Sequence, residues 1–288
     1  MARAISLYRI SLLFLGFTLV VFFWSGRGLA METETTAWIG LSVMDFGYQE
    51  FGDSGELLDR EDGLVPGLTV GVMQPWNNWF GGLEGVIYSG EVTYDGQTQS
   101  GIPLETDTDE LIIDAAWQLG YWFNRAESFN FALYGGLGYH YWRRDIRPTA
   151  LTDGTPVAGL LETYQWKYGL LGFKVKFNQS DIVYWKIDAQ LLRTIDPEIE
   201  VDFQGFGEFD DTQLELGEKY GTRINLSWNY EYSKTQSFEI VPFYEQWDLG
   251  RSPEKTVTSN GVPAGWRIFE PRSETRNFGI SIMLKLKL

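Results

Sequence analysis

The chain of 288 residues contains no cysteine. Without thiols it can form neither disulfide bonds nor thiolate metal sites, so non-covalent contacts alone must stabilise its fold. Aromatic residues make up 16% of the chain and apolar residues 44%, and glycine contributes 32 positions. This composition excludes an intrinsically disordered polypeptide.

Basic residues are scarce: Lys and Arg number 23 against 39 Asp and Glu, for a formal net charge of -16. Proteins bind nucleic acid chiefly by replacing the counterions of its phosphates with Lys and Arg, so we expect no nucleic-acid partner. After residue 30 the chain also lacks an apolar run long enough for a membrane helix, and it lacks a sustained helical period.

The first thirty residues have the pattern of a signal peptide. Arg3 and Arg9 come before or at the start of an apolar run over 10–24, and the small residues Gly28 and Ala30 follow. This order predicts cleavage after Ala30, which leaves residues 31–288 as a single domain. An uncleaved membrane helix is the open alternative.

Beyond residue 30, apolar residues recur with a period of two in segment after segment, which predicts β-strands throughout. The expected strands are 37–50, 66–76, 79–94, 109–123, 129–145, 161–177, 182–195, 214–232, 237–249 and 273–288. Many reach the length that a tilted strand needs to cross a membrane, about 9 to 11 residues. The alternation slips across 170–172, which we interpret as a β-bulge.

The gaps between these segments alternate between long and short along the whole chain. The long gaps are 51–65, 95–108, 146–160, 196–213 and 250–272, and the short ones are 76–79, 124–128, 178–181 and 233–236. Up-and-down barrels of the bacterial outer membrane have short periplasmic turns, long outer loops and an even number of strands. We therefore predict an all-β, closed antiparallel transmembrane barrel of about ten strands, with eight and twelve as alternatives.

The two faces of the predicted strands differ in polarity. In 109–123, for example, Leu111, Ile113 and Trp117 alternate with Glu110 and Asp114. Aromatic residues gather near the short gaps, as in the interfacial girdle of a membrane barrel, at Trp76, Trp79, Tyr121, Phe123, Phe129, Phe177, Trp185, Tyr232 and Phe238.

The inward faces carry charges of both signs. This predicted lumen network comprises Glu110, Asp114, Arg144, Lys186, Asp188, Lys219, Arg223, Glu231 and Glu239. Buried charges are costly unless paired, and a barrel of about ten strands is only slightly wider than one filled by side chains. We expect these residues to neutralise one another and to plug the lumen; a narrow channel for small solutes is the alternative.

The leader, the alternating segments and the last strand, 277–288, together resemble a bacterial outer-membrane β-barrel protein. The last strand is similar to the assembly signal of that class but ends in Leu288 where an aromatic residue is common. The resemblance implies insertion by the barrel assembly machinery, and contact with outer-membrane lipid and lipopolysaccharide. We expect a monomer.

The ten-strand layout with five long loops is most similar to the omptins, the outer-membrane proteases. That resemblance implies an Asp pair opposite an Asp-His pair near the outer rim. Asp107 and Asp109 could supply the first pair, but the chain's single histidine is His140, and Asp210-Asp211-Thr212 offers no second one. We keep the fold analogy and expect no proteolysis.

His140 is the other weak catalytic candidate, because a neutral imidazole is poised to act as a base near neutral pH. A packing role in the lumen near Trp142 and Arg144 is the simpler interpretation. The loops are acidic, with Asp53, Glu56, Asp59, Glu61 and Asp62 in the first and Asp196, Glu198, Glu200, Asp202, Glu208, Asp210 and Asp211 in the fourth. Their spacing matches no calcium loop, so we expect no cofactor and no defined metal site beyond loosely bound divalent cations.

These patterns favour a non-enzymatic outer-membrane barrel with a structural or surface-interaction role in the envelope. The alternatives are a narrow solute channel and a hydrolase at the outer rim that acts on peptide or lipid. The sequence names no ligand or receptor.

Overall fold

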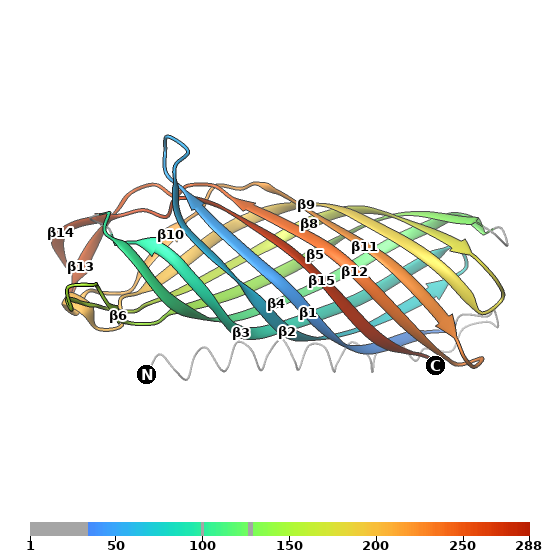
Figure 1. Ribbon diagram of the computed structural model, residues 1–288. Helices are drawn as coiled ribbons and strands as arrows, with labels where there is room; N and C mark the ends of the chain where they lie inside the picture. The colour runs from blue at the N-terminus through green and yellow to red at the C-terminus, as the bar shows by residue number, and fades with distance from the viewer. Residues whose placement is uncertain (1–33, 99–100, 126–128) are drawn as a thin grey trace. The chain divides into compact units, whose positions relative to one another are not determined.

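The computed structural model describes residues 34–98, 101–125 and 129–288 (Figure 1). The predicted signal peptide, residues 1–30, lies outside them. Ten long strands form the barrel: β1 (Thr36–Phe51), β2 (Leu57–Trp76), β3 (Trp79–Gln97), β4 (Pro103–Arg125), β5 (Phe129–Ile146), β8 (Leu160–Asn178), β9 (Val183–Asp202), β11 (Tyr220–Glu231), β12 (Gln236–Leu249) and β15 (Arg272–Lys287). Among the described residues, no helix has the length and apolar character needed to cross a bilayer.

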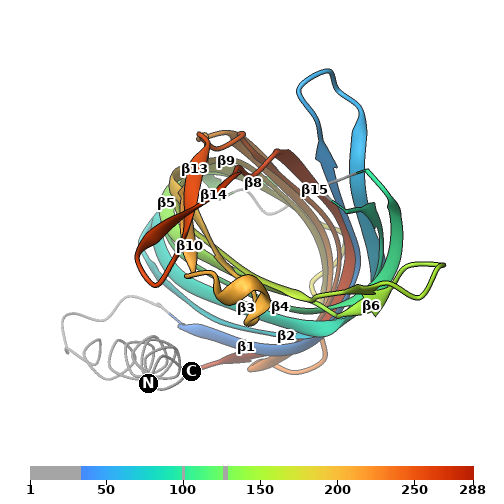
Figure 2. The same ribbon diagram turned by 90° about the vertical axis from the view of Figure 1, so that its left-hand side faces the viewer.

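The ten strands close into a ring in which each is antiparallel to both of its neighbours. The closing pair is β1 with β15, whose register runs from Thr36 opposite Lys287 to Phe51 opposite Arg272. Figure 2 looks down this ring from the end that carries the long connections, here called the long-loop end. The opposite, short-turn end carries the short connections. The closed ten-strand barrel confirms the prediction.

Smaller elements lie in the connections at the long-loop end (Figure 1). They are β6 (Thr149–Ala150), β7 (Pro156–Val157), β10 (Thr212–Glu215), β13 (Lys255–Ser259), β14 (Val262–Ile268) and a 3₁₀ turn, η1 (Phe206–Glu208). β10 pairs with the end of β9, and β13 with β14 form a separate hairpin. The two longest connections, β9–β11 and β12–β15, therefore contain secondary structure of their own.

Several expected strand boundaries are wrong, all at the long-loop end. β2 begins at Leu57 and β4 at Pro103, β9 continues to Asp202, and β11 begins only at Tyr220 because 212–215 forms the separate β10. Apolar alternation marks only the part of a strand that faces lipid. The ladder continues beyond that part, through residues that read as loop in the sequence.

The expected bulge at 170–172 is also wrong. β8 alternates regularly there, with Leu170 in the lumen and Leu171 outside. The register shift occurs opposite Gln165 and Lys167, where β9 contains Asp196 at a positive φ of 48°. Leu170 is an apolar residue on the lumenal face. In the sequence it interrupts the apolar–polar alternation, although the strand itself alternates regularly.

The outer surface carries a broad apolar belt. Its exposed side chains include Ile39, Leu41, Leu68, Trp117, Leu133, Leu137, Leu171, Phe173, Leu191, Ile224, Leu226, Ile280 and Ile282. Toward the long-loop end the outward positions change to charged residues, namely Asp45, Asp62, Glu91, Asp109, Arg143, Lys167, Arg193 and Arg276. This change marks one edge of the membrane-facing zone, because charge is costly in hydrocarbon.

Aromatic side chains mark the other edge of the belt, as predicted. At the short-turn end Trp79 contacts Tyr121 with ring centroids 5.1 Å apart, and Phe129 contacts Phe177 at 5.4 Å. Trp79, Phe123, Phe129, Phe177, Trp185 and Tyr232 are all exposed. Amphipathic rings in this position favour the membrane interface.

Glycines make room for rings that lie flat against the lumenal wall. A Cβ added to Gly172 would overlap the ring of Tyr134, and one added to Gly138 would overlap Tyr168. The hydroxyl of Tyr134 in turn donates to Asp188, which fixes the ring in place. Gly169, on the same strand as Gly172, faces open space.

Gly172→Ala should therefore lower the free energy of unfolding by about 1 to 3 kcal/mol, because the ring of Tyr134 must shift and weaken its contact with Asp188. Gly169→Ala is the matched control in the same strand and should have almost no effect. Urea unfolding of the barrel in lipid vesicles, followed by tryptophan fluorescence, measures both. Equal effects of the two substitutions would contradict this packing.

Candidate functional site

The lumen is divided along its axis into three zones. At and beyond the charged edge of the belt, polar side chains surround Arg144; we call this zone the Arg144 cluster. Next comes a layer of aromatic residues around Trp166, the tryptophan layer. A cavity of about 570 Å³ then extends toward the short-turn end.

Arg144, on β5, is fully buried and holds the first zone together. Its Nη1 lies 2.6 Å from Oε2 of Glu162 and 3.2 Å from Oε1 of Glu50, and its Nη2 lies 3.0 Å from Oε1 of Glu61. The guanidinium also stands 4.2 Å from the ring centroid of Tyr48. Buried like charges repel strongly, so Arg144 allows these carboxylates to share one confined space.

The cluster joins opposite walls of the barrel. Tyr48 lies on β1 and Tyr164 on β8, which stand five strands apart in the ring of ten, and their hydroxyls are 3.2 Å from each other. Tyr48 donates to Glu50 at 2.6 Å, and Tyr164 donates to Glu270 at 2.6 Å. Hydrogen bonds that span the diameter leave little space for a water path at this level.

The tryptophan layer fills much of the lumen below this cluster. His140 is 4% exposed and stacks on Trp166, with centroids 4.2 Å apart. Trp247 meets Trp166 edge-on at 5.4 Å and Tyr168 at 5.1 Å. These side chains come from β5, β8 and β12, so the layer reaches across the barrel.

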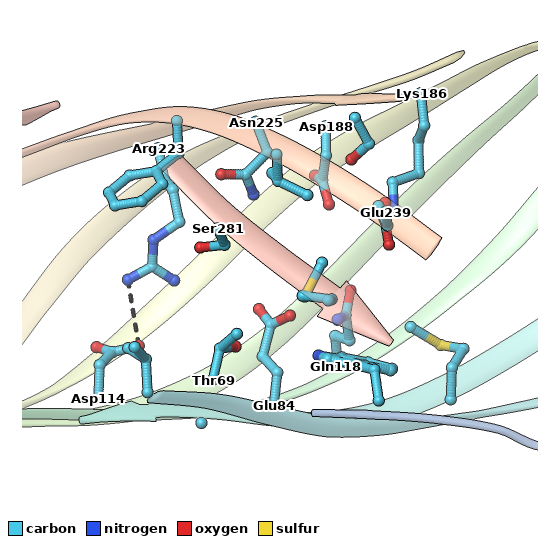
Figure 3. A pocket seen from close by; sticks show the side chains of 18 of the residues that line it. Thr69, Glu84, Asp114, Gln118, Lys186, Asp188, Arg223, Asn225, Glu239 and Ser281 are labelled. Carbon is cyan, nitrogen blue, oxygen red and sulfur yellow. Dashed lines mark hydrogen bonds and ion pairs between the residues drawn. The ribbon is translucent and has the colours of Figure 1, made fainter. Parts of the chain in front are cut away.

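Asp114 connects the tryptophan layer to the cavity. Its Oδ2 lies 3.0 Å from Nδ1 of His140, and its Oδ1 accepts hydrogen bonds from the Tyr168 hydroxyl at 2.8 Å and from Arg223 Nη2 at 3.2 Å. Figure 3 shows Arg223 and Asp114 reaching toward each other from opposite walls. Arg223 also donates through Nε to Glu245 at 2.6 Å.

The cavity is lined by further pairs. Lys174 donates to Asp188 at 2.6 Å and to Gln118 at 2.9 Å. Oε1 of Glu239 lies 3.1 Å from Nζ of Lys186, and Oε2 of Glu239 lies 2.9 Å from Nζ of Lys285.

Most of the predicted lumen network lies where the sequence placed it. Glu110 accepts a hydrogen bond from Trp142 at 2.5 Å, and Glu231 pairs with Lys287 at 3.3 Å. Asp114, Arg144, Lys186, Asp188, Arg223 and Glu239 all face the lumen in the pairs described above. The exception is Lys219, which the prediction placed wrongly: it precedes β11 at the rim, and its side chain is exposed.

The two catalytic candidates from the omptin resemblance face away from the lumen. Asp109 and Asp107 have half-exposed side chains and surround Arg147, whose Nη2 lies 2.7 Å from Oδ1 of Asp109. His140 stands in the tryptophan layer, on the inside of the wall. The barrel therefore does not bring His140 together with Asp107 and Asp109.

The predicted acidic loops are only partly loops. Asp59 and Glu61 belong to β2 and are buried beside Arg144, while Glu198 and Glu200 belong to β9. Asp210 does lie in a loop, where Thr258 Oγ1 donates to it at 2.6 Å and the Gly261 amide at 2.9 Å. These hydrogen bonds hold the pKa of Asp210 below its ordinary value and attach the β13–β14 hairpin to the preceding loop. No group of acidic or histidine side chains among the described residues has metal-site geometry.

Sequence reasoning missed half of the lumenal groups. Glu270 was assigned to a loop and Glu50 to the last position of a strand without a lumenal role, and the bulge expected in 161–177 left Glu162, Lys174 and Lys176 unassigned to the lumen. A strictly regular alternation along β8 would have placed these last three in the lumen. The pairing of His140 with Asp114 was missed as well. The two residues lie opposite each other in the β4–β5 register, across the short connection that the sequence had located.

Arg144→Met should lower the free energy of unfolding by about 3 to 5 kcal/mol, because it leaves buried carboxylates without their cation. Arg147→Met is the matched control: Arg147 is also paired with carboxylates, but its side chain is 42% exposed, and its loss should cost about 1 kcal/mol or less. Urea unfolding in lipid vesicles measures both. A loss at Arg144 no larger than at Arg147 would contradict a central role for the cluster.

No protein-family model matches this chain, and no curated protein matches its sequence. Its fold is similar to solved outer-membrane barrels. The outer membrane protease OmpT of Escherichia coli superposes with a TM-score of 0.60 at 10% identity, over 92% of this chain and 99% of that one. The NalP translocator domain of Neisseria meningitidis gives a TM-score of 0.42 at 10% identity, over 98% and 97%. OprG of Pseudomonas aeruginosa gives 0.40 at 11%, over 89% and 96%.

At such low identity the likeness to OmpT concerns the fold and carries no activity. The fold fits the rest of the structure, because the apolar belt, its aromatic edge and the closed ladder are the features that a lipid environment demands. The chain is a closed, ten-stranded transmembrane β-barrel with the fold of bacterial outer-membrane barrels.

Proposed function

We propose that this protein is a non-conducting, non-enzymatic barrel whose role is structural or is carried by its outer surface. The observation that carries the proposal is the filled lumen at the long-loop end. There Trp142, Trp166, Trp247, Arg144 and Tyr164 are each 2% exposed or less. A pore needs a continuous water path, and these side chains occupy the space where it would run.

The structured outer surface supports the second half of the proposal. The ring of Phe209 packs between Phe203 at 5.4 Å and Trp266 at 6.0 Å, which joins two connections at the long-loop end. Phe206 and Trp266 remain 55% and 52% exposed. Exposed aromatic side chains on a fixed scaffold are typical of binding surfaces.

The charged edge of the belt fits contact with lipopolysaccharide. Asp45 points outward just beyond the apolar zone, where a divalent cation could bridge its carboxylate to a lipid phosphate. We expect a monomer, because the closed ladder leaves no barrel strand with a free edge.

A channel for small solutes is the alternative that the cavity favours. Its polar lining would admit water from the short-turn end, but the tryptophan layer and the Arg144 cluster stand between it and the other side. A hydrolase is less well supported. His140 is stacked and hydrogen-bonded inside the lumen, and Asp107 and Asp109 are paired with Arg147 outside it.

Single-channel recording in planar bilayers tests the proposal. The unmodified barrel should show no steady conductance. The quadruple variant Tyr48→Ala, Trp142→Ala, Trp166→Ala and Trp247→Ala should conduct, because it removes large rings from both filled levels, whereas Leu137→Ala on the lipid-facing side of β5 should stay silent. Stepwise currents from the unmodified barrel that change when Lys186 or Asp188 is replaced would establish the channel instead.

A further inference from the structure

The mouth of the cavity at the short-turn end is rich in lysine. Lys176 lies near the end of β8, Lys186 near the start of β9, and Lys285 and Lys287 at the end of β15; all four line the cavity. They come from three strands, β8, β9 and β15, and Lys176 lies directly opposite Lys186 in the β8–β9 register. Glu231 and Glu239 are the carboxylates paired with these lysines.

Four lysines against two carboxylates leave this mouth with an excess of two positive charges. Glu239 is shared by Lys186 and Lys285, and Glu231 is paired with Lys287. Lys176 has no carboxylate within ion-pair distance in the described part of the chain. Its ammonium instead stands 3.8 Å from the ring centroid of Tyr184. The arrangement is incomplete without an anion.

Deeper in the cavity the charge changes sign. Glu84 points into the space from β3, as Figure 3 shows, and makes no hydrogen bond or ion pair with the residues that the structure describes. Asp188 is paired with Lys174, and Asp114 and Glu245 share Arg223, so together with Glu84 the interior carries more carboxylates than cations. An anionic group is therefore favoured at the mouth and disfavoured in the interior.

The wall between these levels mixes polar side chains, such as Thr69, Gln118 and Asn225, with apolar ones. The apolar side chains are Trp38, Met73, Phe80, Trp122, Phe243 and Met283. The volume of about 570 Å³ falls within the range of small-molecule sites. Trp166, Trp247 and Trp142 line the inner end of the cavity, so a molecule that enters from the short-turn end meets large aromatic rings there.

We propose that the lumenal cavity binds a small anionic amphiphile that enters from the short-turn end. Its carboxylate or phosphate lies among the four lysines, with Lys176 as the principal contact. Its apolar part extends inward along the aromatic and methionine side chains. This goes beyond the proposed non-conducting role and does not rest on it, because binding and conductance are measured separately.

The test uses three probes that differ only in the charge of their head group: 4-phenylbutanoate, 4-phenylbutan-1-ol and 4-phenylbutylamine. Each is titrated calorimetrically into the barrel in lipid nanodiscs, with empty nanodiscs subtracted. The carboxylate should bind about 10-fold more tightly than the alcohol, the size expected for one charge-assisted contact, and the amine most weakly. Equal affinities, or tightest binding of the amine, would overturn the proposal.

Two variants locate the site. Lys176→Gln should weaken 4-phenylbutanoate binding about 5- to 10-fold and leave the alcohol unchanged, since it removes charge and little else. Lys234→Gln is the matched control, because Lys234 is an exposed lysine in the turn between β11 and β12 at the same end of the barrel. Similar losses from both lysine variants would mean general attraction to a basic surface and would overturn the site.

Thr69→Phe places a ring inside the cavity from β2 and should abolish binding of all three probes. A shift in gel migration between unheated and heated samples, and a urea unfolding midpoint close to that of the unmodified barrel, confirm that this variant folds. Unchanged binding by folded Thr69→Phe would place the probes outside the lumen and contradict the proposal. The lysine variants test the same claim without filling the cavity.

Discussion

The hydrogen-bonded pairing of β1 with β15 is the interaction on which the rest of the structure depends. In hydrocarbon, a backbone N–H or C=O without a partner costs several kcal/mol, so a sheet can cross the membrane only if it has no edge. The pairing from Thr36 opposite Lys287 to Phe51 opposite Arg272 removes the last edge. Once the ring is closed, each strand has one face toward lipid and one toward the lumen, and the sequence alternates accordingly.

Closure also creates the lumen, and the lumen explains the chain's composition. Ten strands enclose a space that large side chains can fill from both walls, which is why tryptophan, tyrosine and arginine lie inside together with carboxylates. At the long-loop end several carboxylates surround the single Arg144, whereas lysines outnumber acids at the short-turn end. The same interior thus contains a filled, acid-rich level and an open cavity with a lysine-rich mouth, which separates the proposed lack of conductance from the proposed binding site.

The sequence predicts the strand number and part of the lumenal charge network, because alternation is a local property that each strand displays by itself. The prediction fails where outward residues are polar or inward residues are apolar, because alternation in polarity then no longer reports which face a residue occupies. Asp59 and Glu61 lie in β2 beyond the apolar belt, where outward residues are polar too and the strand reads as a loop. Leu170 is an apolar residue inside the lumen, so it suggested a bulge that hid Glu162, Lys174 and Lys176. Lys219 has the same parity as the lumenal residues of β11 but lies before the strand begins. Contacts across the barrel, such as that of Tyr48 with Tyr164, depend on the diameter of the ring, which no local sequence pattern specifies.

Closure itself can be measured directly, because the chain contains no cysteine to interfere. Val43 and Ile280 face each other across the β1–β15 pair, although most of the chain separates them. With both replaced by cysteine, oxidation of the barrel in lipid vesicles should give an intramolecular disulfide that mass spectrometry detects in most molecules. Val43→Cys with Phe173→Cys, on the opposite wall, should give none. No cross-link in the first pair, or cross-links only between molecules, would contradict the closed barrel.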